Sequence, residues 1–450
     1  MPSGAVEVPP ELLSSRAAPT AVDAFLRAHL ACRDGLPLLR FPPAPAPALS
    51  DTWRDALTAA AADGTLAYPL ALRSSNWAST RCTALEALRQ VKVDDSVYGV
   101  ESWVPRGAPS TAAGQQRAAV RGPTTTAAWP TRGTYTAWPA FPHGGGTALC
   151  IRREHHQMGR LVSSAYAETA RLTAKRLGCP SMLEAWCARA GAAAAAAVAK
   201  YGGVLSRMNL ADAVHDTMGA HEVTCFPPWL AAVVYKYFGA TSVLDPCGGW
   251  GDRLFAALAL GLRYVCTDPT PAVHAAYDAM LADVAAAGVD TTRVTHVVAP
   301  FEDVPLDDPR LAGLFDLVMT SPPYFRLEVY STDANQSVTR AENANSAASP
   351  RYDGPMQFVS TDDVEELPVL AAWCRDFLFP LAANALARLR SGGHLVLAVN
   401  DYKGVHYVHA LVAHVATLRG VEFRGVIGHE ISDIVTANGV LAPLFVWRKT

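Results

Sequence analysis

The tetrapeptide Ser321-Pro322-Pro323-Tyr324 directly follows the apolar run Phe315–Thr320. A short run of apolar and β-branched residues predicts a buried strand. Neither proline can donate a ladder hydrogen bond, and each disfavours helix in the residue before it. The Ser321 and Pro322 carbonyls are therefore expected to end unpaired at a strand tip, beside a hydroxyl and an aromatic ring. Such a tip can hold a planar group that carries an NH2, although Pro-Pro-Tyr also occurs in ordinary turns.

A second pattern lies upstream, in Ser242–Arg253. A short strand ends at Asp245, Gly249 and Gly251 follow, and a helix begins soon after. These glycines allow a tight turn and close approach of a ligand. Asp268 follows the next strand, where a carboxylate can accept both hydroxyl hydrogens of a ribose. Because Asp245 would repel a pyrophosphate and suits an ammonium group, the pattern favours S-adenosylmethionine over a nicotinamide dinucleotide.

Together the two patterns resemble those of class I S-adenosylmethionine-dependent methyltransferases. Within that class they resemble the exocyclic-amine DNA methyltransferases, which make N4-methylcytosine or N6-methyladenine. The family's cofactor turn reads Asp-Pro-Phe-x-Gly-x-Gly, and Asp245–Gly251 carries Cys247 in place of the aromatic residue. The family's catalytic element, Asp/Asn/Ser-Pro-Pro followed by an aromatic residue, matches Ser321–Tyr324 in full. The resemblance covers residues 226–450 and implies S-adenosylmethionine as cofactor, with no metal.

The resemblance also implies roles for single residues. Ser321 Oγ and the Pro322 carbonyl would hold the amine hydrogens, and Tyr324 would stack on the base. The implied catalytic residues are Ser321, Pro322, Pro323 and Tyr324; the implied cofactor-binding residues are Phe226, Pro228, Asp245, Cys247, Gly249, Gly251, Asp268, Glu302 and Asp303. Simpler structural roles compete with some of these: Phe226–Trp229 could be a helix N-terminus, and Glu302 and Asp303 could start a turn.

Serine at the first position of the catalytic element is more often linked with N4 of cytosine in the family, and aspartate with N6 of adenine. The predicted function is therefore a DNA methyltransferase that favours N4 of cytosine over N6 of adenine. C5 methylation is disfavoured because it needs a cysteine nucleophile where Ser321 stands. Asn400-Asp401 could line the base pocket. The alternatives are an RNA-base or protein-amide N-methyltransferase, or a catalytically silent nucleic-acid-binding protein.

Helices and strands alternate from Phe226 onward, which predicts an α/β fold: a doubly wound, Rossmann-like methyltransferase sheet. The expected organisation is an Ala/Pro-rich arm at 1–50, a mainly helical N-terminal domain at 51–225, and a methyltransferase domain at 226–450. The polar stretch 325–365 is too long for a plain connection and predicts a lid or recognition loop. Two strand-like runs near the C-terminus predict an antiparallel hairpin at the sheet edge.

Residues 102–153 contain six arginines, no Asp or Glu, and several aromatic residues. Arginine with aromatic residues suits phosphate neutralisation and base stacking, although a solvated irregular region would have the same composition. Residues 1–225 carry a formal charge of +5 and the remainder −8. DNA is therefore the expected partner, bound through 102–153 and 325–365.

The nine cysteines are scattered and form no CxxC pair, which disfavours a zinc site. The N-terminal residues lack the pattern of a signal peptide, and no apolar run reaches the roughly 18 residues of a membrane span. An intracellular protein is expected, in either the cytoplasm or the nucleus. The target sequence and the oligomeric state are not predicted.

Overall fold

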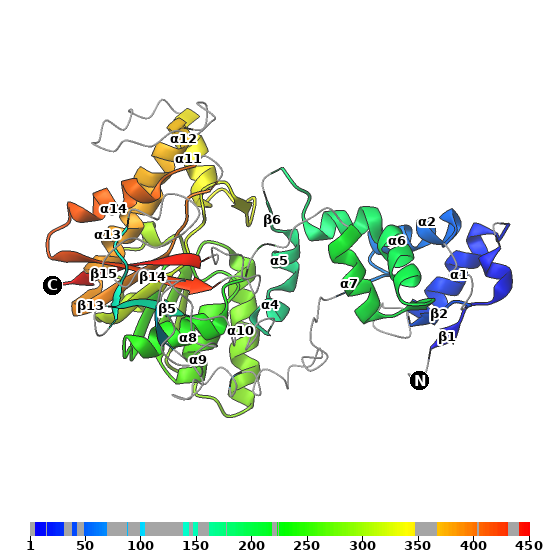
Figure 1. Ribbon diagram of the computed structural model, residues 1–450, viewed down its shortest axis with the longest axis horizontal. Coiled ribbons are helices and arrows are strands. Elements are labelled where there is room, and N and C mark those ends of the chain that lie inside the picture. Colours follow the sequence, from blue (N-terminus) through cyan, green and yellow to red (C-terminus); the bar gives the residue numbers. More distant parts are fainter. Residues whose placement is uncertain are drawn as a thin grey trace, which may run out of the picture. The chain divides into compact units, whose positions relative to one another are not determined.

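The computed structural model describes residues 5–14, 16–30, 38–42, 49–69, 88, 100–103, 138–143, 147–151, 162–176, 178–217, 223, 225–346, 367–402, 405–430 and 441–450. The chain divides into two compact units (Figure 1). The first comprises residues 1–80, 168–224 and 328–330. The second comprises residues 81–167, 225–327 and 331–450. Each unit is described by itself below.

The first unit is mainly helical, as the sequence predicts. Its elements are β1 (Val6–Glu7), η1 (Pro10–Leu13), α1 (Pro19–Leu30), β2 (Leu39–Arg40), α2 (Asp51–Ala62), α5 (Glu168–Thr173), β6 (Lys175–Arg176), α6 (Met182–Lys200), β7 (Val204–Leu205), α7 (Arg207–Thr217) and β12 (Glu328–Val329). A capping box starts α6: Ser181 Oγ accepts from the Glu184 amide at 3.1 Å, and Glu184 accepts from the Ser181 amide at 2.6 Å. Gly191 lets α6 approach α2 closely, since a Cβ there would lie 2.1 Å from the Arg54 carbonyl oxygen.

The N-terminal residues differ from the expected arm at 1–50. Leu26 on α1, Leu39 on β2 and the neighbouring Phe41 are fully buried in the core of the first unit. The apolar residues Val22, Leu26 and Leu30 recur every four positions on α1 and bury one face of the helix. This helical spacing, rather than the Ala/Pro content of residues 1–50, explains why α1 packs into the core. In the later part of this unit, α5 ends at Thr173 and the short strand β6 follows it.

The second unit is built on one large sheet. Its strands are β3 (Val100–Trp103), β4 (Pro142–His143), β5 (Thr147–Ile151), β8 (Ser242–Asp245), β9 (Arg263–Asp268), β10 (Val294–Val298), β11 (Phe315–Thr320), β13 (Leu389–Ala398), β14 (Val421–Glu430) and β15 (Leu441–Lys449). Their order is β10-β9-β8-β11-β13-β15-β14-β5-β3, with β4 paired to β5. The five strands from β10 to β13 are parallel, and β15 is antiparallel to both of its neighbours.

The strand order reverses between β8 and β11, which are paired through Leu317–Val243 and Val318–Leu244. The chain first builds β9 and β10 outward on one side of β8, and then β11 and β13 on the other. This is the doubly wound, Rossmann-like arrangement that the sequence predicts. In such sheets the crevice at the carboxyl ends of the two strands that flank the reversal is the usual ligand site.

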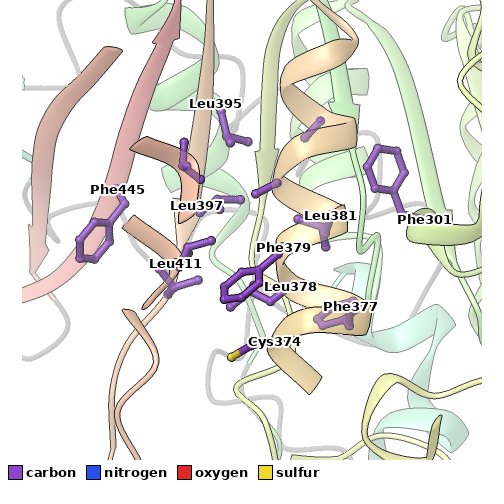
Figure 2. Close-up of a cluster of buried hydrophobic side chains, with 14 of the residues drawn as sticks. Phe301, Cys374, Phe377, Leu378, Phe379, Leu381, Leu395, Leu397, Leu411 and Phe445 are labelled. Atoms are coloured by element: carbon purple, nitrogen blue, oxygen red, sulfur yellow. The ribbon is translucent and has the colours of Figure 1, made fainter. Parts of the chain in front are cut away.

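Helices cover both faces of this sheet (Figure 1). The helical elements are α4 (Val162–Tyr166), α8 (Pro228–Tyr237), α9 (Asp252–Leu260), α10 (Pro271–Ala286), η3 (Phe301–Asp303), η4 (Pro309–Leu311), α11 (Ser337–Ser346), α12 (Leu367–Trp373), η5 (Cys374–Leu378), α13 (Phe379–Ala387) and α14 (Val408–Ala416). Figure 2 shows the core between α13, α14 and the sheet, where Leu381, Leu395 and Leu411 meet. Within the described residues, one helical run, Leu367–Ala387, is long and apolar enough to cross a membrane, but 67% of its apolar 18-residue window is buried inside the protein.

The C-terminal part of the sheet differs from the expected edge hairpin. β14 and β15 are antiparallel, but β15 lies between β13 and β14 rather than at the edge. β14 continues the sheet into β5. The strands β3, β4 and β5 (100–103, 142–143 and 147–151) thus belong to the second unit rather than to an N-terminal domain at 51–225. Residues 104–137, which carry four of the six arginines of 102–153, lie outside the described residues.

Substitution of Gly425 tests the close contact between β14 and the chain at Pro139. It has φ +107°, and a Cβ would lie 2.7 Å from the Pro139 carbonyl oxygen, which accepts from the Val426 amide at 2.9 Å. We expect Gly425→Ala to lower the free energy of unfolding in urea by about 1–3 kcal/mol more than Gly420→Ala does. Gly420 has a similar left-handed φ of +71° but no atom closer than 3.7 Å. Equal losses would contradict the close approach of Pro139 to β14.

Candidate active site

Asp245, the last residue of β8, is fully buried and paired with an arginine. Its Oδ2 accepts from Arg253 Nε at 2.7 Å and from the Tyr264 hydroxyl at 2.5 Å. Its Oδ1 accepts from the Cys247 amide at 3.3 Å, and Arg253 also donates to the Cys247 carbonyl. The Asp245 charge therefore has a protein partner at the start of α9. Its predicted role toward an ammonium group stays a prediction.

Asp268, the last residue of β9, lies directly against the glycine turn. Its Oδ2 accepts from the Gly249 amide at 3.0 Å, and its Oδ1 accepts from the Thr270 amide at 2.9 Å. Burial raises the pKa of the Asp268 carboxyl to about 6, although these two hydrogen bonds act in the opposite direction. The structure thus brings two predicted cofactor residues, Gly249 and Asp268, into direct contact.

The glycine turn packs on one side and is open on the other. A Cβ at Gly248 would lie 2.6 Å from the Tyr277 hydroxyl, and one at Gly251 would lie 3.2 Å from the Tyr277 ring. The Tyr277 hydroxyl donates to the Gly249 carbonyl at 2.5 Å. A Cβ at Gly249, by contrast, would find no atom closer than 3.9 Å. Because α10 supports the turn from behind through Tyr277, the free side at Gly249 can receive a ligand.

The tip at Ser321–Tyr324 is joined to this turn by one hydrogen bond. Thr320 Oγ1, at the end of β11, accepts from the Cys247 amide at 3.1 Å. Ser321 Oγ and the Tyr324 hydroxyl lie 3.4 Å apart. Within the described residues, neither the Ser321 nor the Pro322 carbonyl accepts a hydrogen bond from a turn or a side chain. The tip therefore presents free acceptors beside an aromatic ring, next to the glycine turn.

Phe325, directly after the tip, has an unusual backbone conformation. Its φ is +50°, and it alone among the described non-glycine residues has a positive φ. For a bulky side chain this left-handed conformation costs roughly 1–2 kcal/mol. The Phe325 ring is fully buried and lies 5.7 Å from the Trp373 ring, which holds the conformation in place. The packing of Phe325 thus fixes the direction in which the chain leaves Tyr324.

Glu302 and Asp303 lie on η3, after β10. Glu302 Oε1 accepts from Arg340 Nη1 at 2.8 Å, and Asp303 Oδ1 accepts from Arg340 Nη2 at 2.9 Å. The Glu302 side chain is only 4% exposed, and its Oε2 is buried without a partner. Burial raises the pKa of the Glu302 carboxyl to about 7, against the opposing effect of Arg340.

Other predicted residues have structural roles in the described chain. Pro228 is the first residue of α8, and the Phe226 ring lies 5.1 Å from the Arg253 guanidinium. Burial raises the pKa of the Cys247 thiol well above its usual range, so the thiol stays protonated. Asp401 accepts from the first-turn amides of α14, Tyr407 and Val408, at 2.9 and 3.0 Å. Asp401 therefore caps the start of α14, and the suggestion that Asn400-Asp401 could line the base pocket stays a prediction.

The described groups suit a nucleoside ligand. The turn offers an open backbone at Gly249, Asp268 offers carboxylate acceptors, and the unpaired Glu302 Oε2 requires a donor to offset its burial. Within the described residues, no three His, Cys, Asp or Glu side chains are grouped as metal ligands would be.

Sequence reasoning missed three residues of this site: Arg253, Thr320 and Arg340. Arg253 stands two positions after Gly251, so a basic residue at the helix start was a readable signal for a partner of Asp245. Thr320 was read only as part of a strand. Arg340 lies in a polar stretch without periodicity, and its pairing with Glu302 across 38 positions has no local signal.

Comparison with known proteins gives a limited result. No protein-family model and no curated protein sequence matches the chain. Solved structures that it resembles include TrmN from Thermus thermophilus, with 18% identity over 50% of this chain and 49% of that one, and a TM-score of 0.29. An rRNA methylase from Streptococcus thermophilus has 12% identity over 50% of this chain and 98% of that one, with a TM-score of 0.29.

A third resembling structure is the O-methyltransferase TomG from Streptomyces achromogenes in complex with SAM. It has 17% identity over 52% of this chain and 86% of that one, with a TM-score of 0.29. The chain spans about half the length of the TrmN structure. TM-scores of this size leave the fold to be assigned from the strand order itself.

The raised pKa of Glu302 predicts a pH dependence of stability. Its folded-state pKa of about 7 exceeds the ordinary 4.5, so the folded chain binds this proton more tightly than the unfolded chain. The resulting stabilisation is full below the unfolded pKa and is lost as the pH rises through 7. Between pH 5.5 and 8.5 the loss amounts to about 2 kcal/mol.

Glu302→Gln removes this titration. We expect the difference in unfolding free energy between pH 5.5 and 8.5 to be about 2 kcal/mol smaller in Glu302→Gln than in the unsubstituted protein. Asp303→Asn is the control, because Asp303 pairs with the same arginine but is half exposed. Parallel pH profiles for Glu302→Gln and the unsubstituted protein, measured by urea unfolding, would contradict the burial of an ionisable Glu302.

Proposed function

We propose that the chain is an S-adenosylmethionine-dependent methyltransferase that modifies an exocyclic amine of a nucleic-acid base. DNA is the favoured substrate, and N4 of cytosine is favoured over N6 of adenine because the first residue of the tip is Ser321. One observation carries the proposal: Thr320 Oγ1 accepts from the Cys247 amide at 3.1 Å. This contact sets the amine-holding tip and the glycine turn side by side at the crevice between β8 and β11.

Three elements would hold the cofactor. The open backbone at Gly249 would receive its amino-acid part, and Asp268 would accept from the ribose hydroxyls. Glu302 Oε2, buried and unpaired, would accept from the adenine amine. When bound, S-adenosylmethionine supplies a methyl group on a positively charged sulfur, which leaves as a neutral thioether.

The tip would prepare the nitrogen that is methylated. An exocyclic amine is a poor nucleophile because its lone pair is delocalised into the ring. Ser321 Oγ and the Pro322 carbonyl would accept both N–H hydrogens, which favours a lone pair directed at the methyl group. When the new bond forms, the positive charge passes from the sulfur to the nitrogen, and one of the two hydrogens then leaves as a proton to solvent water. Alignment and electrostatics would supply most of the acceleration.

Tyr324 would hold the base by stacking. Its hydroxyl lies 3.4 Å from Ser321 Oγ, so the ring would stack on the base close to the group that would orient the amine. A base in a duplex must be rotated out of the stack to reach this tip, at a cost of a few kcal/mol, unless the substrate is single-stranded. The strained but buried Phe325 would keep Tyr324 from moving away when the base enters.

Transfer of tritium from methyl-labelled S-adenosylmethionine to duplex DNA, RNA and protein tests the proposed function. Label in DNA is the expected result. Label only in RNA or only in protein would keep the enzyme class and replace the substrate, since both polymers offer an sp2 NH2. Nucleic-acid binding without any label would identify a catalytically silent binding protein instead.

Substitutions at the tip and at the turn should separate the two roles. Stacking on an aromatic ring is worth about 1–3 kcal/mol, so Tyr324→Ala should lower methyl transfer about 10- to 100-fold and change cofactor affinity little. Asp268→Ala should mainly weaken cofactor binding, by about 10- to 100-fold, through loss of charge-assisted hydrogen bonds.

Tyr324→Phe is the matched control for the tip because it keeps the ring. It should retain most of the transfer rate. Cofactor affinity is measured by calorimetry and transfer by label incorporation. An equal loss of cofactor affinity in Tyr324→Ala and Asp268→Ala would show that the tip and the turn do not have separate roles.

The arginine-rich segment should contribute to DNA binding. Deleting 102–153 would also remove β5. Replacing arginines by glutamine removes their charge and leaves this strand in place, so such substitutions are the better test. We expect Arg106→Gln, Arg117→Gln and Arg121→Gln together to weaken DNA binding and to reduce the slope of log affinity against log salt, by about 0.9 for each phosphate that is no longer neutralised. Fluorescence anisotropy over a salt series measures this slope.

Three exposed arginines elsewhere in the second unit provide a control of equal charge: Arg293, Arg310 and Arg390, whose side chains are 62%, 56% and 59% exposed. Their joint replacement by glutamine should change the slope less. The same slope change for both sets would indicate a general charge effect and remove 102–153 from the binding surface.

A further inference from the structure

Residues 331–346 are part of the expected lid or recognition loop at 325–365, and they pack within the second unit. The segment contains a turn followed by α11, which packs on α12. Trp373 Nε1 donates to Ser337 Oγ at 3.2 Å and fixes the start of α11. The polar composition of the segment therefore does not prevent it from taking a defined position.

That position is over the loops that follow β9 and β10. Asn335 Nδ2 donates to the Pro269 carbonyl at 3.1 Å, and Gln336 Nε2 donates to Thr270 Oγ1 at 3.1 Å. Pro269 and Thr270 directly follow Asp268. One turn further along, Arg340 pairs with both carboxylates of η3. The segment thus connects the loop that carries Asp268 with the loop that carries Glu302.

Two buried oxygens lie unpaired along this connection, Asn335 Oδ1 and Glu302 Oε2. Exchanging the positions of Asn335 Oδ1 and Nδ2 by a flip of the amide would be costly. The Pro269 carbonyl would then lose the donor that Nδ2 supplies. A buried acceptor without a donor costs about 1–3 kcal/mol. Both oxygens therefore call for a ligand that donates hydrogen bonds.

We propose that residues 331–346 form the outer wall of the cofactor pocket, with Asn335 Oδ1 accepting a hydrogen bond from the adenosyl group. This proposal rests on the proposed cofactor. The donor is a ribose hydroxyl or the adenine amine, the two donor types that an adenosyl group offers. Arg340 is a positioning residue that closes the wall through Glu302 and Asp303. The segment then serves the cofactor rather than the nucleic acid.

Calorimetric titration with S-adenosylhomocysteine tests the role of Asn335. We expect Asn335→Ala to weaken binding about 5- to 10-fold, the value of one hydrogen bond. Asn343→Ala, at an exposed asparagine on α11 in the same segment, should leave binding unchanged. Equal affinities for Asn335→Ala and the unsubstituted protein would overturn the proposal while the proposed function stands.

Two analogues identify the donor. One carries hypoxanthine in place of adenine and so lacks the amine, and the other carries 2′,3′-dideoxyribose and so lacks both ribose hydroxyls. With the analogue that lacks the donor bound by Asn335, the Asn335→Ala substitution should cause no further loss. The same loss with both analogues and the parent compound would show that Asn335 acts indirectly and would overturn the contact.

Hydrogen–deuterium exchange on the unsubstituted protein is independent of any folding defect in the variants. The amides of residues 337–346 should exchange more slowly when S-adenosylhomocysteine is bound, and Arg340→Ala should reduce this protection. Binding of S-adenosylhomocysteine without slower exchange of these amides would contradict the proposal that residues 331–346 form a wall of the cofactor pocket. No binding at all by the unsubstituted protein would refute the proposed function itself.

Discussion

The buried ion pair between Asp245 and Arg253 is the interaction on which the candidate site depends. It joins the end of β8 to the start of α9, and Tyr264 ties the same carboxylate to β9. Two charges removed from water are costly unless each is paired and hydrogen-bonded, and here Arg253 also reaches the Cys247 carbonyl. The strand end, the turn and the helix start are thereby held in one arrangement. Loss of either partner would leave an uncompensated charge directly beneath the glycine turn.

The glycine turn, which this ion pair holds in place, also contacts the strand ends on both sides of it. On one side Asp268 holds the Gly249 amide, and on the other Thr320 holds the Cys247 amide. Because β8 is central, with β9 and β11 as its neighbours, these two contacts place Asp268 and the Ser321–Tyr324 tip on opposite sides of one crevice. A methyl donor held from β9 and a base held from β11 would meet there. This is the geometric basis of the proposed transfer.

The central part of this arrangement was predictable from the sequence because its signals are local. As the sequence predicts, β11 has the bounds of the apolar run Phe315–Thr320, β8 ends at Asp245, and α9 begins directly after Gly251. The pairing of β5 with β14 and the position of β15 inside the sheet depend on contacts between distant segments, for which short-range patterning has no signal. The same holds for Arg340, whose partners lie 37 and 38 positions upstream. The Asp245–Arg253 pair is an intermediate case. Both residues stand near the glycine turn in the sequence, but only the fold shows that their charges pair with each other.

Mass spectrometry of nucleosides from DNA treated with the protein and S-adenosylmethionine tests the central claim most directly. The proposed chemistry forms a bond to an exocyclic nitrogen, so N4-methylcytosine is the expected product, and N6-methyladenine would keep the mechanism with the other base. Methylation at C5 of cytosine would contradict the role of Ser321–Tyr324, because that reaction proceeds through a different nucleophile. If DNA remains unmodified while the protein binds the cofactor, DNA is excluded as the substrate.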